Sequence, residues 1–323
     1  MPDVLISENI TGAAMDALRE QFDTVFEPEL WRQPDRLLAV IPAFRALIVR
    51  NQTQLTRALI EAGTRLEIIG RAGVGMDNVD LDAANECGIV VALTPEQNTN
   101  SVAELVIGLL LSLARMIPEA DRDTKAGGWN RWRFIGTEIS GKTLGVVGLG
   151  RIGSSTAVKA RALGMEIIAY DPYVDPESLR AMEVRARLTS FDEVLTRADY
   201  VTAHVPENTE TRGMFGAEQF ERMKPGAFFI NAARGGVVQE AALLQALQAK
   251  RIAGAALDVR QQEPAQPSAF DELPNVILVP HMGAQTHEAQ RRVVTAICRD
   301  VAAVLRGEEA RNFANFSKPG RRG

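Results

Sequence analysis

The sequence predicts an α/β protein with two doubly wound parallel sheets, each covered by helices on both faces. Short apolar strands alternate with helical segments from residue 1 to about residue 98, and a second series runs from Thr143 to about residue 285. Such alternation is typical of parallel sheets, because the crossover helices cover both faces. The chain has 323 residues, 46% of them hydrophobic and 24% charged, which is enough for about two domains.

The first series is expected to form one lobe. Apolar runs bounded by turn residues predict strands at 4–6, 45–49, 66–69 and 88–92, with helices at 11–21 and 53–62. The turn 70–78 follows a strand end, where open α/β sheets bind ligands.

Two long helical patterns connect the lobes. Segment 102–117 is apolar around most of its circumference, which predicts a helix packed on several sides, and Ser101 with Glu104 forms a capping-box pattern at its start. Segment 287–306 has one apolar face and is expected to return to the first lobe. The predicted domains are therefore a discontinuous one, 1–98 with 286–323, and a continuous one, 99–285. We expect the tail 312–323 to be mobile.

The second series opens with a nucleotide-binding motif. The strand-like run 143–147 is followed by Gly148, Gly150 and Gly153 in the spacing G-x-G-x-x-G, and then by a helical segment. Glycines so placed let a backbone approach a pyrophosphate at a helix N-terminus. Asp171 ends the next strand, about 20 positions on, where a carboxylate binds a ribose diol and repels the extra phosphate of NADP. NAD is therefore the predicted cofactor, and a tight turn with a charged strand end is the alternative interpretation.

Three charged residues follow later strands of the same lobe, on the rim where a nicotinamide is expected. Arg234 can hold a substrate carboxylate in a bidentate way. His281 can carry the proton of a substrate hydroxyl, and Glu263 can hold its other nitrogen and fix the tautomer. This set suits hydride transfer to or from a 2-hydroxy acid. Taken singly, each residue also has a structural interpretation: a loop cap, a surface ion pair and a strand end.

The other histidines and the cysteines carry weaker signals. His204 follows strand 200–203 and is expected to line the cofactor cleft or to cap the strand, and His287 is expected at the surface. Cys87 and Cys298 are interpreted as small buried hydrophobes in a reducing compartment. Asp, Glu, His and Cys nowhere show metal-ligand spacing, so no metal is predicted.

The overall charge limits the classes of partner that the protein is expected to bind. A net charge of −5 and a pI near 5.5 provide no basic field for nucleic acid or an acidic membrane. The start of the sequence lacks the positive charge and the long apolar run of a secretory signal. We therefore expect a cytoplasmic protein with a small-molecule substrate.

These motifs resemble the D-isomer-specific 2-hydroxyacid dehydrogenases. The resemblance lies in segments 148–153, 231–236, 256–259 with Glu263-Pro264, and 280–284 with Thr286. Segments 70–80, 100–105 and 136–143 are most similar to the D-3-phosphoglycerate dehydrogenase branch of this family. The match extends from about residue 45 to residue 295.

The resemblance implies a Rossmann NAD-binding domain, residues 99–285, inserted in a flavodoxin-like substrate-binding domain, residues 1–98 and 286–323. It implies a homodimer formed mainly by the cofactor domain, catalysis by Arg234, Glu263 and His281, and Asp258 near the nicotinamide carboxamide. The implied cofactor-binding residues are Gly148, Gly150, Arg151, Ile152, Gly153, Asp171, His204, Pro206, Thr211, Ala232, Arg234, Asp258, His281 and Gly283.

The resemblance also implies a substrate site. Backbone amides around Val74 and Gly75 are expected to help Arg234 hold the carboxylate, and Arg50, Arg71 and Arg131 match positions that bind phosphate in the branch. Val74 stands where the branch often has a hydroxyl residue, and Trp132 interrupts a segment that is often more basic. The sequence as given ends at Gly323 without the regulatory domains that many such enzymes carry, so serine feedback is not expected.

The predicted function is that of an NAD-dependent oxidoreductase acting at C2 of a D-2-hydroxy acid or 2-keto acid with a second anionic group, as in 3-phosphoglycerate. Hydroxypyruvate, glyoxylate and a sulfonated acid such as sulfolactate are alternative substrates. An NADH-sensing binding protein is the alternative from another class, because the related corepressors carry the same arginine, glutamate and histidine.

Overall fold

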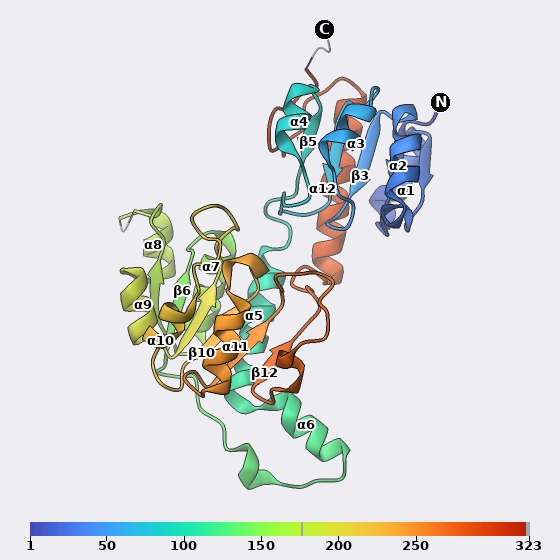
Figure 1. Cartoon of the computed structure of the whole chain (residues 1–323). Helices are drawn as coiled ribbons and strands as arrows, with labels where there is room; N and C mark the ends of the chain where they lie inside the picture. Colours follow the sequence, from blue (N-terminus) through green and yellow to red (C-terminus); the bar gives the residue numbers. More distant parts are fainter. Residues whose placement is uncertain (176, 321–323) are drawn as a thin grey trace. The chain divides into compact units, whose positions relative to one another are not determined.

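The computed structural model describes residues 1–175 and 177–320, and the chain divides into two compact units (Figure 1). Unit 1 is formed by Met1–Asn98 and Gln285–Gly323, and unit 2 by Thr99–Ala284. Residues 321–323, which belong to the tail predicted to be mobile, lie outside the described residues. Each unit has its own parallel sheet, so the predicted fold class is confirmed.

Unit 1 contains a five-stranded sheet of order β2-β1-β3-β4-β5, in which all neighbours are parallel. This order is the flavodoxin-like one. Its strands are β1 (Val4–Ile6), β2 (Thr24–Phe26), β3 (Ala46–Val49), β4 (Ile68–Arg71) and β5 (Val90–Ala92), and its helices are α1 (Ala13–Gln21), α2 (Pro34–Val40), α3 (Arg57–Ala62), α4 (Leu81–Glu86) and α12 (His287–Leu305).

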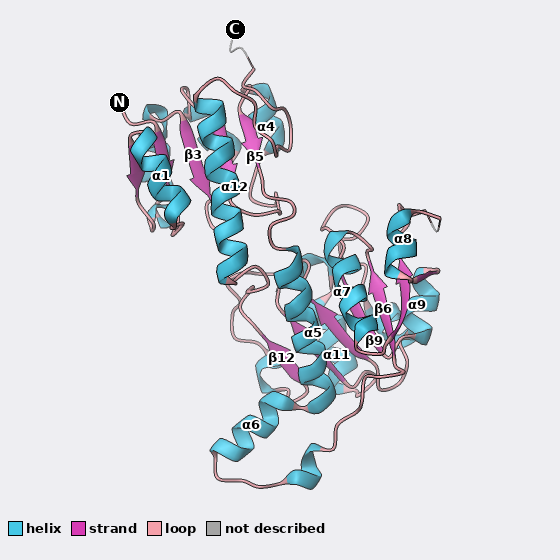
Figure 2. Ribbon diagram, turned by 180° about the vertical axis from the view of Figure 1, so that it is seen from behind, coloured by secondary structure: helices cyan, strands magenta, loops and turns pink. Residues whose placement is uncertain are grey.

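Helices cover both faces of this sheet. Val4 and Ile6 pack with α1 and α12 in one buried cluster, whereas Leu5 packs with α2, α3 and α4 in another. Because successive side chains of a strand point to opposite faces, a strand buried on both faces needs an uninterrupted apolar run. Figure 2 shows α1 and α12 together on one face.

Unit 2 contains a seven-stranded parallel sheet of order β12-β11-β10-β9-β6-β7-β8, which is the Rossmann order with one added strand. Its strands are β6 (Thr143–Val147), β7 (Glu166–Tyr170), β8 (Arg187–Leu188), β9 (Tyr200–Ala203), β10 (Phe228–Asn231), β11 (Gly254–Leu257) and β12 (Val276–Leu278). Its helices are α5 (Thr99–Arg115), α6 (Ile117–Lys125), α7 (Arg151–Ala162), α8 (Leu179–Val184), α9 (Phe191–Arg197), α10 (Ala217–Arg222) and α11 (Glu240–Gln248), and a short 3₁₀ helix η3 spans Arg131–Phe134.

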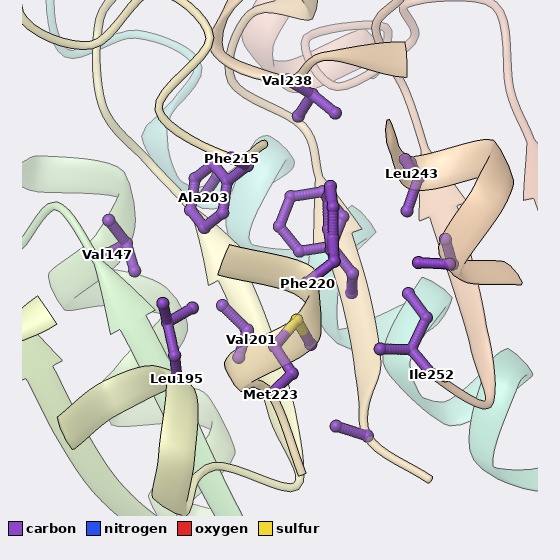
Figure 3. Packing of buried hydrophobic residues seen from close by; sticks show 14 of the residues in the cluster. Val147, Leu195, Val201, Ala203, Phe215, Phe220, Met223, Val238, Leu243 and Ile252 are labelled. Carbon is purple, nitrogen blue, oxygen red and sulfur yellow. The ribbon is translucent and has the colours of Figure 1, made fainter. Parts of the chain in front are cut away.

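Two buried clusters hold the second sheet. Leu144 and Val146 pack with α5 and α7 on one face, and Val147 packs with α9, α10 and α11 on the other. Figure 3 shows the latter cluster, in which Phe215 and Phe220 lie among aliphatic side chains of the strands and helices. The sheet is therefore buried on both sides, and its strand ends form the edge on which loops can carry function.

Two local predictions are wrong. Helix α5 begins at Thr99, so Ser101 lies inside its first turn and is not a cap that precedes it. The tail is not mobile over residues 312–320: Phe313 pairs with Ala92, and the Asn315 side chain bonds to the backbone of Ile89 and Val91. Because β5 is an edge strand, these contacts satisfy backbone groups that would otherwise be exposed for pairing.

Across the described ranges 1–175 and 177–320, no single helix is long and apolar enough to cross a membrane. Helices α5 and α6 meet the criteria only when joined, and they are bent by 64° at their junction. Met116 at this junction has a left-handed φ of 51°, which ends α5.

Candidate active site

Two glycines of the turn after β6 are required by the backbone itself. Gly148 has a φ of 94°, and a Cβ on it would lie 2.7 Å from the carbonyl oxygen of His204. A Cβ on Gly153, in the first turn of α7, would lie 2.0 Å from the carbonyl oxygen of Gly148. Any other residue at either position would therefore force the main chain to shift.

Gly150 is different, because no described atom lies within 4 Å of where its Cβ would be. It precedes α7 as the N-cap with a φ of −69°, which any residue can adopt. Packing thus gives no reason for glycine here. Open space before the free N–H groups of a helix N-terminus is what the diphosphate of a dinucleotide needs, so the turn fits the predicted cofactor.

Asp171 ends β7 beside this turn and is fixed by its backbone contacts. One carboxylate oxygen accepts the N–H of Leu149 at 2.8 Å, and the other accepts the N–H of Tyr173 at 2.9 Å. Each oxygen keeps a second lone pair that can accept from a ribose hydroxyl. The Tyr173 hydroxyl donates to Glu210 at 2.6 Å, so the loops after β7 and β9 are linked at the rim.

His204 lies on the other side of the glycine turn, after β9. The backbone N–H of His204 donates to the carbonyl of Val147 at 2.7 Å, and the ring Nε2 lies 3.1 Å from the Thr202 hydroxyl. Burial lowers the pKa of His204 to about 4, so the imidazole is neutral at physiological pH. The strand order reverses between β6 and β9, and doubly wound sheets bind nucleotides in the crevice at such a point.

The remaining residues of the predicted cofactor set follow the same strand ends. They are Arg151 and Ile152 in the first turn of α7, Pro206 and Thr211 in the turn after β9, Ala232 after β10, and Gly283 after β12. The Thr211 hydroxyl donates to the carbonyl of Pro206 at 2.6 Å, which closes that turn.

The three predicted catalytic residues follow three adjacent strands. Arg234 comes after β10, Glu263 after β11 and His281 after β12, and parallel neighbours have their carboxyl ends on one edge. Nδ1 of His281 lies 2.6 Å from Oε2 of Glu263, and the charge of Arg234 acts on the same carboxylate. The structure therefore brings imidazole, carboxylate and guanidinium together.

The Glu263 carboxyl is held in its ionised form. Burial raises its pKa, but three neighbours outweigh burial and lower the pKa. They are His281, through its hydrogen bond and charge, the backbone N–H of Arg260, and the charge of Arg234. Because an ionised carboxylate can only accept, Nδ1 of His281 carries a proton. This leaves Nε2, which makes no hydrogen bond to any described residue, as the nitrogen that can exchange a proton with substrate.

Asp258 holds the segment that carries His281. Its two carboxylate oxygens accept the N–H groups of Met282 at 2.6 Å and Gly283 at 3.0 Å, and its carbonyl accepts the N–H of His281 at 2.8 Å. Burial raises the pKa of Asp258. His281 itself has a φ of 51°, a conformation that costs a residue with a side chain about 1 kcal/mol or more, so the segment needs such support.

Four residues implied for substrate binding belong to unit 1. Arg50 and Arg71 lie at the ends of β3 and β4, and Val74 and Gly75 lie in the turn that follows β4. The Arg50 guanidinium bonds to Gln290, its Nε has no partner among the described residues, and burial lowers its pKa. Glu8 accepts the backbone N–H of Arg50 at 2.8 Å and its charge partly opposes the effect of burial, but the guanidinium forms no ion pair among the described residues, so it suits an anionic ligand.

Arg131 lies in unit 2, exposed on η3. Figures 1 and 2 show the loop between α6 and β6 extending beyond the sheet of this unit before Ile139 packs in the cluster around α5 and α7. Among the described residues Arg131 makes no hydrogen bond or ion pair with Arg234, Glu263 or His281, so its part in substrate binding stays a prediction. Among residues 1–175 and 177–320, no group of three or more His, Cys, Asp or Glu side chains is arranged to hold a metal ion.

Two residues beside the catalytic set gave no recognisable signal in the sequence. Glu240 and Arg260 form an ion pair at 2.9 Å next to Glu263. Glu240 opens a helix, where an acidic residue is common, and Arg260 stands in a strand-end loop. A contact between a helix start and a loop about 20 residues further on is not encoded in local spacing, and the place of Arg260 between Asp258 and Glu263 is the one available hint.

Comparison with known proteins places the chain in a family. Residues 107–283 match the model of the D-isomer specific 2-hydroxyacid dehydrogenase family, NAD binding domain. The D-3-phosphoglycerate dehydrogenase of Archaeoglobus fulgidus is 44% identical over 314 residues, which cover 97% of this chain and 59% of that protein. The TT0316 protein of Thermus thermophilus has a TM-score of 0.91 at 32% identity, covering 97% of this chain and 99% of its own. A glyoxylate reductase from Paecilomyes thermophila has a TM-score of 0.86 at 29% identity, covering 97% and 99%.

The chain belongs to the D-isomer specific 2-hydroxyacid dehydrogenase family. Its predicted resemblance to the D-3-phosphoglycerate dehydrogenase branch is confirmed, and so is the predicted cofactor, NAD. The chain spans about three fifths of the length of the curated relatives it matches.

Proposed function

We propose that the protein is an NAD-dependent oxidoreductase that interconverts a D-2-hydroxy acid and its 2-keto acid. The observation that supports this most directly is the 2.6 Å contact of His281 with ionised Glu263, within the electrostatic reach of Arg234. These groups follow the strand ends of a sheet whose glycine turn fits a dinucleotide. NAD, when bound, supplies a nicotinamide that exchanges a hydride with C2.

The residues of this chain have separate roles in the proposed reaction. Arg234 binds the substrate carboxylate with its planar guanidinium and orients C2. His281 exchanges the proton of the C2 oxygen through Nε2, while Glu263 keeps the proton on Nδ1 and stabilises the imidazolium. In the reducing direction His281 donates a proton to the carbonyl oxygen, and in the oxidising direction it accepts one from the hydroxyl.

Asp171 supports a preference for NAD over NADP. Its carboxylate is held at the end of β7 by the Leu149 and Tyr173 N–H groups, so it cannot easily move away from an added phosphate. Replacing Asp171 by Ser should narrow the ratio of kcat/KM for NADH over NADPH by about tenfold or more. An unchanged ratio would show that other groups select the cofactor.

A second anionic group on the substrate is proposed because of Arg50 and Arg71, and because the curated relatives are named D-3-phosphoglycerate dehydrogenase. Arg50→Gln should raise the KM for phosphohydroxypyruvate and leave the KM for glyoxylate almost unchanged, since glyoxylate has no second anion. An equal change in the KM for both substrates would favour the alternative function of a glyoxylate reductase. In that case Arg50 would be a structural residue.

The decisive experiment is a substrate panel with NADH. Phosphohydroxypyruvate, hydroxypyruvate, glyoxylate and sulfopyruvate are compared for the wild type, His281→Ala and the matched control His287→Ala. His281→Ala should lower kcat about 10²- to 10⁴-fold without changing NADH binding, and the control should behave as wild type, because His287 opens α12 in unit 1. Negligible turnover by the wild type, with NADH still bound, would favour the NADH-sensing binding protein.

We also propose a cytoplasmic homodimer. Four large apolar side chains are exposed on α6 and the segment after it: Ile117 by 51%, Trp129 by 77%, Trp132 by 85% and Ile135 by 69%. Exposed apolar side chains of this size are typical of a surface that a partner covers, and the resemblance makes a second copy the expected partner. Light scattering should give twice the chain mass for the wild type and a lower mass for Trp129→Ser/Trp132→Ser.

Cys87 and Cys298 are both free thiols, which suits a reducing compartment.

A further inference from the structure

A desolvated ion pair adjoins the proposed catalytic residues of unit 2. Arg260, in the loop after β11, donates Nε and Nη2 to the two carboxylate oxygens of Glu240 at 2.9 and 3.0 Å. Their side chains are only 11% and 21% exposed. The guanidinium also lies 4.9 Å from the centre of the Phe270 ring, and Nη2 reaches the Ser268 hydroxyl at 3.3 Å. Arg260 is therefore fixed in position and in plane.

This pair is charged and has a desolvation cost. Burial raises the pKa of Glu240, but the hydrogen bonds from Arg260 and from the N–H of Gln261, with the Arg260 charge, outweigh it and lower the pKa. Replacing such a pair by apolar residues is often neutral or stabilising, so stability is a weak reason for a protein to keep one. The contacts that the pair makes with its surroundings suggest another reason.

The pair fixes the backbone of residues 260–261 to the start of α11. One oxygen of Glu240 also accepts the N–H of Gln261 at 2.8 Å, and the Gln261 amide donates to the carbonyl of Val238 at 3.0 Å. The N–H of Arg260 donates to Oε1 of Glu263 at 3.1 Å. The other oxygen of Glu263 is the one in contact with Nδ1 of His281. The orientation of the carboxylate thus depends on where this backbone N–H points.

The same backbone also touches the segment of Arg234. A Cβ on Gly235 would lie 1.9 Å from the carbonyl oxygen of Arg260, so the two main chains are in direct contact there. One short segment therefore adjoins the residue after Arg234 and donates to Glu263. Any relaxation of residues 260–261 would change the geometry of both.

We propose that the Glu240–Arg260 pair is a positioning device that aims the Arg260 N–H at Glu263 and thereby orients His281. The inference rests on the proposed function for its catalytic meaning, but the orientation itself is independent of turnover. Arg260 and Glu240 are positioning residues, since neither contacts His281 and both act through Glu263. Without the pair, the Glu263 carboxylate rotates away from Nδ1, and the imidazolium loses its closest anion.

The test uses the full chain and two readouts. The chain has three histidines, so histidine labelled with ¹⁵N in the ring gives a simple spectrum of the ring N–H protons. Burial lowers the pKa of His204 to about 4, so its ring is neutral near pH 7, and exposed His287 is the internal reference. Asp258 and Arg234, the other charged groups that act on His281 or Glu263 in unit 2, stay unchanged. The variants are Arg260→Met, Arg260→Lys and Glu240→Gln, with Arg187→Lys as the matched control in the exposed pair with Glu193.

In Arg260→Met the Nδ1 proton signal of His281 should lose the downfield shift that the hydrogen bond to Glu263 gives it, and kcat should fall by about tenfold or more with little change in NADH binding. Arg260→Lys and Glu240→Gln should lie between this variant and the wild type, because each keeps one partial contact. The His287 signal and the Arg187→Lys control should not move. If Arg260→Met does not fold, the two milder variants decide the outcome.

The failure of this inference is distinguishable from that of the proposed function. Variants that lower only the melting temperature, with the Nδ1 proton signal of His281 and kcat unchanged, would overturn the positioning role and leave a structural ion pair. A wild type that turns over no 2-keto acid would overturn the proposed function, whereas a changed Nδ1 proton signal of His281 in the variants would still support the positioning of the imidazole.

Discussion

His281 depends on a neighbouring side chain for its backbone conformation as well as on Glu263 for its proton. Its φ of 51° is costly for a residue with a side chain, and Asp258 supports it through the N–H groups of Met282 and Gly283. Because its carboxylate oxygens accept both of these N–H groups, we assign Asp258 a role in supporting this segment, in addition to its predicted place near the nicotinamide carboxamide.

Asp258→Asn tests this role. Asparagine can accept only one of the two N–H groups and turns its own N–H₂ towards the other, which leaves a donor unpaired. We expect kcat to fall by about tenfold or more while the melting temperature changes little, because the burial cost of the carboxylate is removed at the same time. Steady-state kinetics and calorimetry provide the two measurements. Asp192→Asn, at an exposed position of α9, should alter neither, because its ion pair with Arg222 is also exposed, and an unaffected kcat in Asp258→Asn would contradict the role.

The Glu263 carboxyl makes the stability of unit 2 depend on pH. Since its pKa in the folded protein is lowered, the carboxyl contributes stability above the pKa of the unfolded chain and loses it as pH falls through the lowered value. Glu263→Gln should therefore destabilise the protein most near pH 7 and least near pH 3. Urea titrations at both pH values measure this. Asp258, whose pKa is raised chiefly by burial, has the opposite sign, and because the Glu263 charge adds to that rise, the opposing contribution becomes smaller in Glu263→Gln.

The catalytic set was open to prediction because each member directly follows an apolar strand. Arg234, Glu263 and His281 needed only the rule that parallel strand ends share an edge. Two other features could not be predicted: the backbone contacts of Asp258 and the ion pair of Glu240 with Arg260. They depend on how separate segments pack, and local spacing contains no information on that packing.

Among the secondary structure elements, fully apolar runs were predictable and short or amphipathic ones were not. Strand β9 agrees with its expected bounds, 200–203, since all four of its residues are buried between the two layers of helices. Strand β8 has two residues, one of them exposed, and no such run marks it. The tail 312–320 is expected to be mobile, but Ala314 and Phe316 pack against the buried clusters of unit 1. It is held by backbone pairing with β5, which composition does not reveal.

Asn315 is the main side-chain link between this tail and β5. Its Oδ1 accepts the N–H of Val91 and its Nδ2 donates to the carbonyl of Ile89, both at 2.9 Å. Asn315→Ala should cost about 2 kcal/mol locally, which corresponds to about 30-fold faster amide exchange in β5. Exchange measured by mass spectrometry tests this, with Lys318→Ala as the control, because its ion pair with Glu309 is exposed. Unchanged exchange in β5 would show that the tail is held by other contacts.

The two units differ in how the chain forms them. Unit 1 is assembled from Met1–Asn98 and Gln285–Gly323, whereas unit 2 is the single stretch Thr99–Ala284 with its own sheet and two buried clusters. We propose that unit 2 is the NAD-binding domain and unit 1 the substrate-binding domain. All the predicted cofactor residues, from Gly148 to Gly283, then lie in one continuous piece.

This division leads to a direct prediction for residues 99–284 expressed alone. They should fold cooperatively and bind NADH with an affinity within about tenfold of the full chain, because a domain with its own core can fold independently. They should reduce no 2-keto acid, since Arg50, Arg71, Val74 and Gly75 are missing. Fluorescence titration with NADH and the substrate panel measure both properties, with Gly150→Val in the same fragment as the control that closes the space before α7. Full turnover by the fragment would contradict a substrate role for unit 1, and loss of NADH binding by a folded fragment would contradict the assignment of the cofactor site to unit 2.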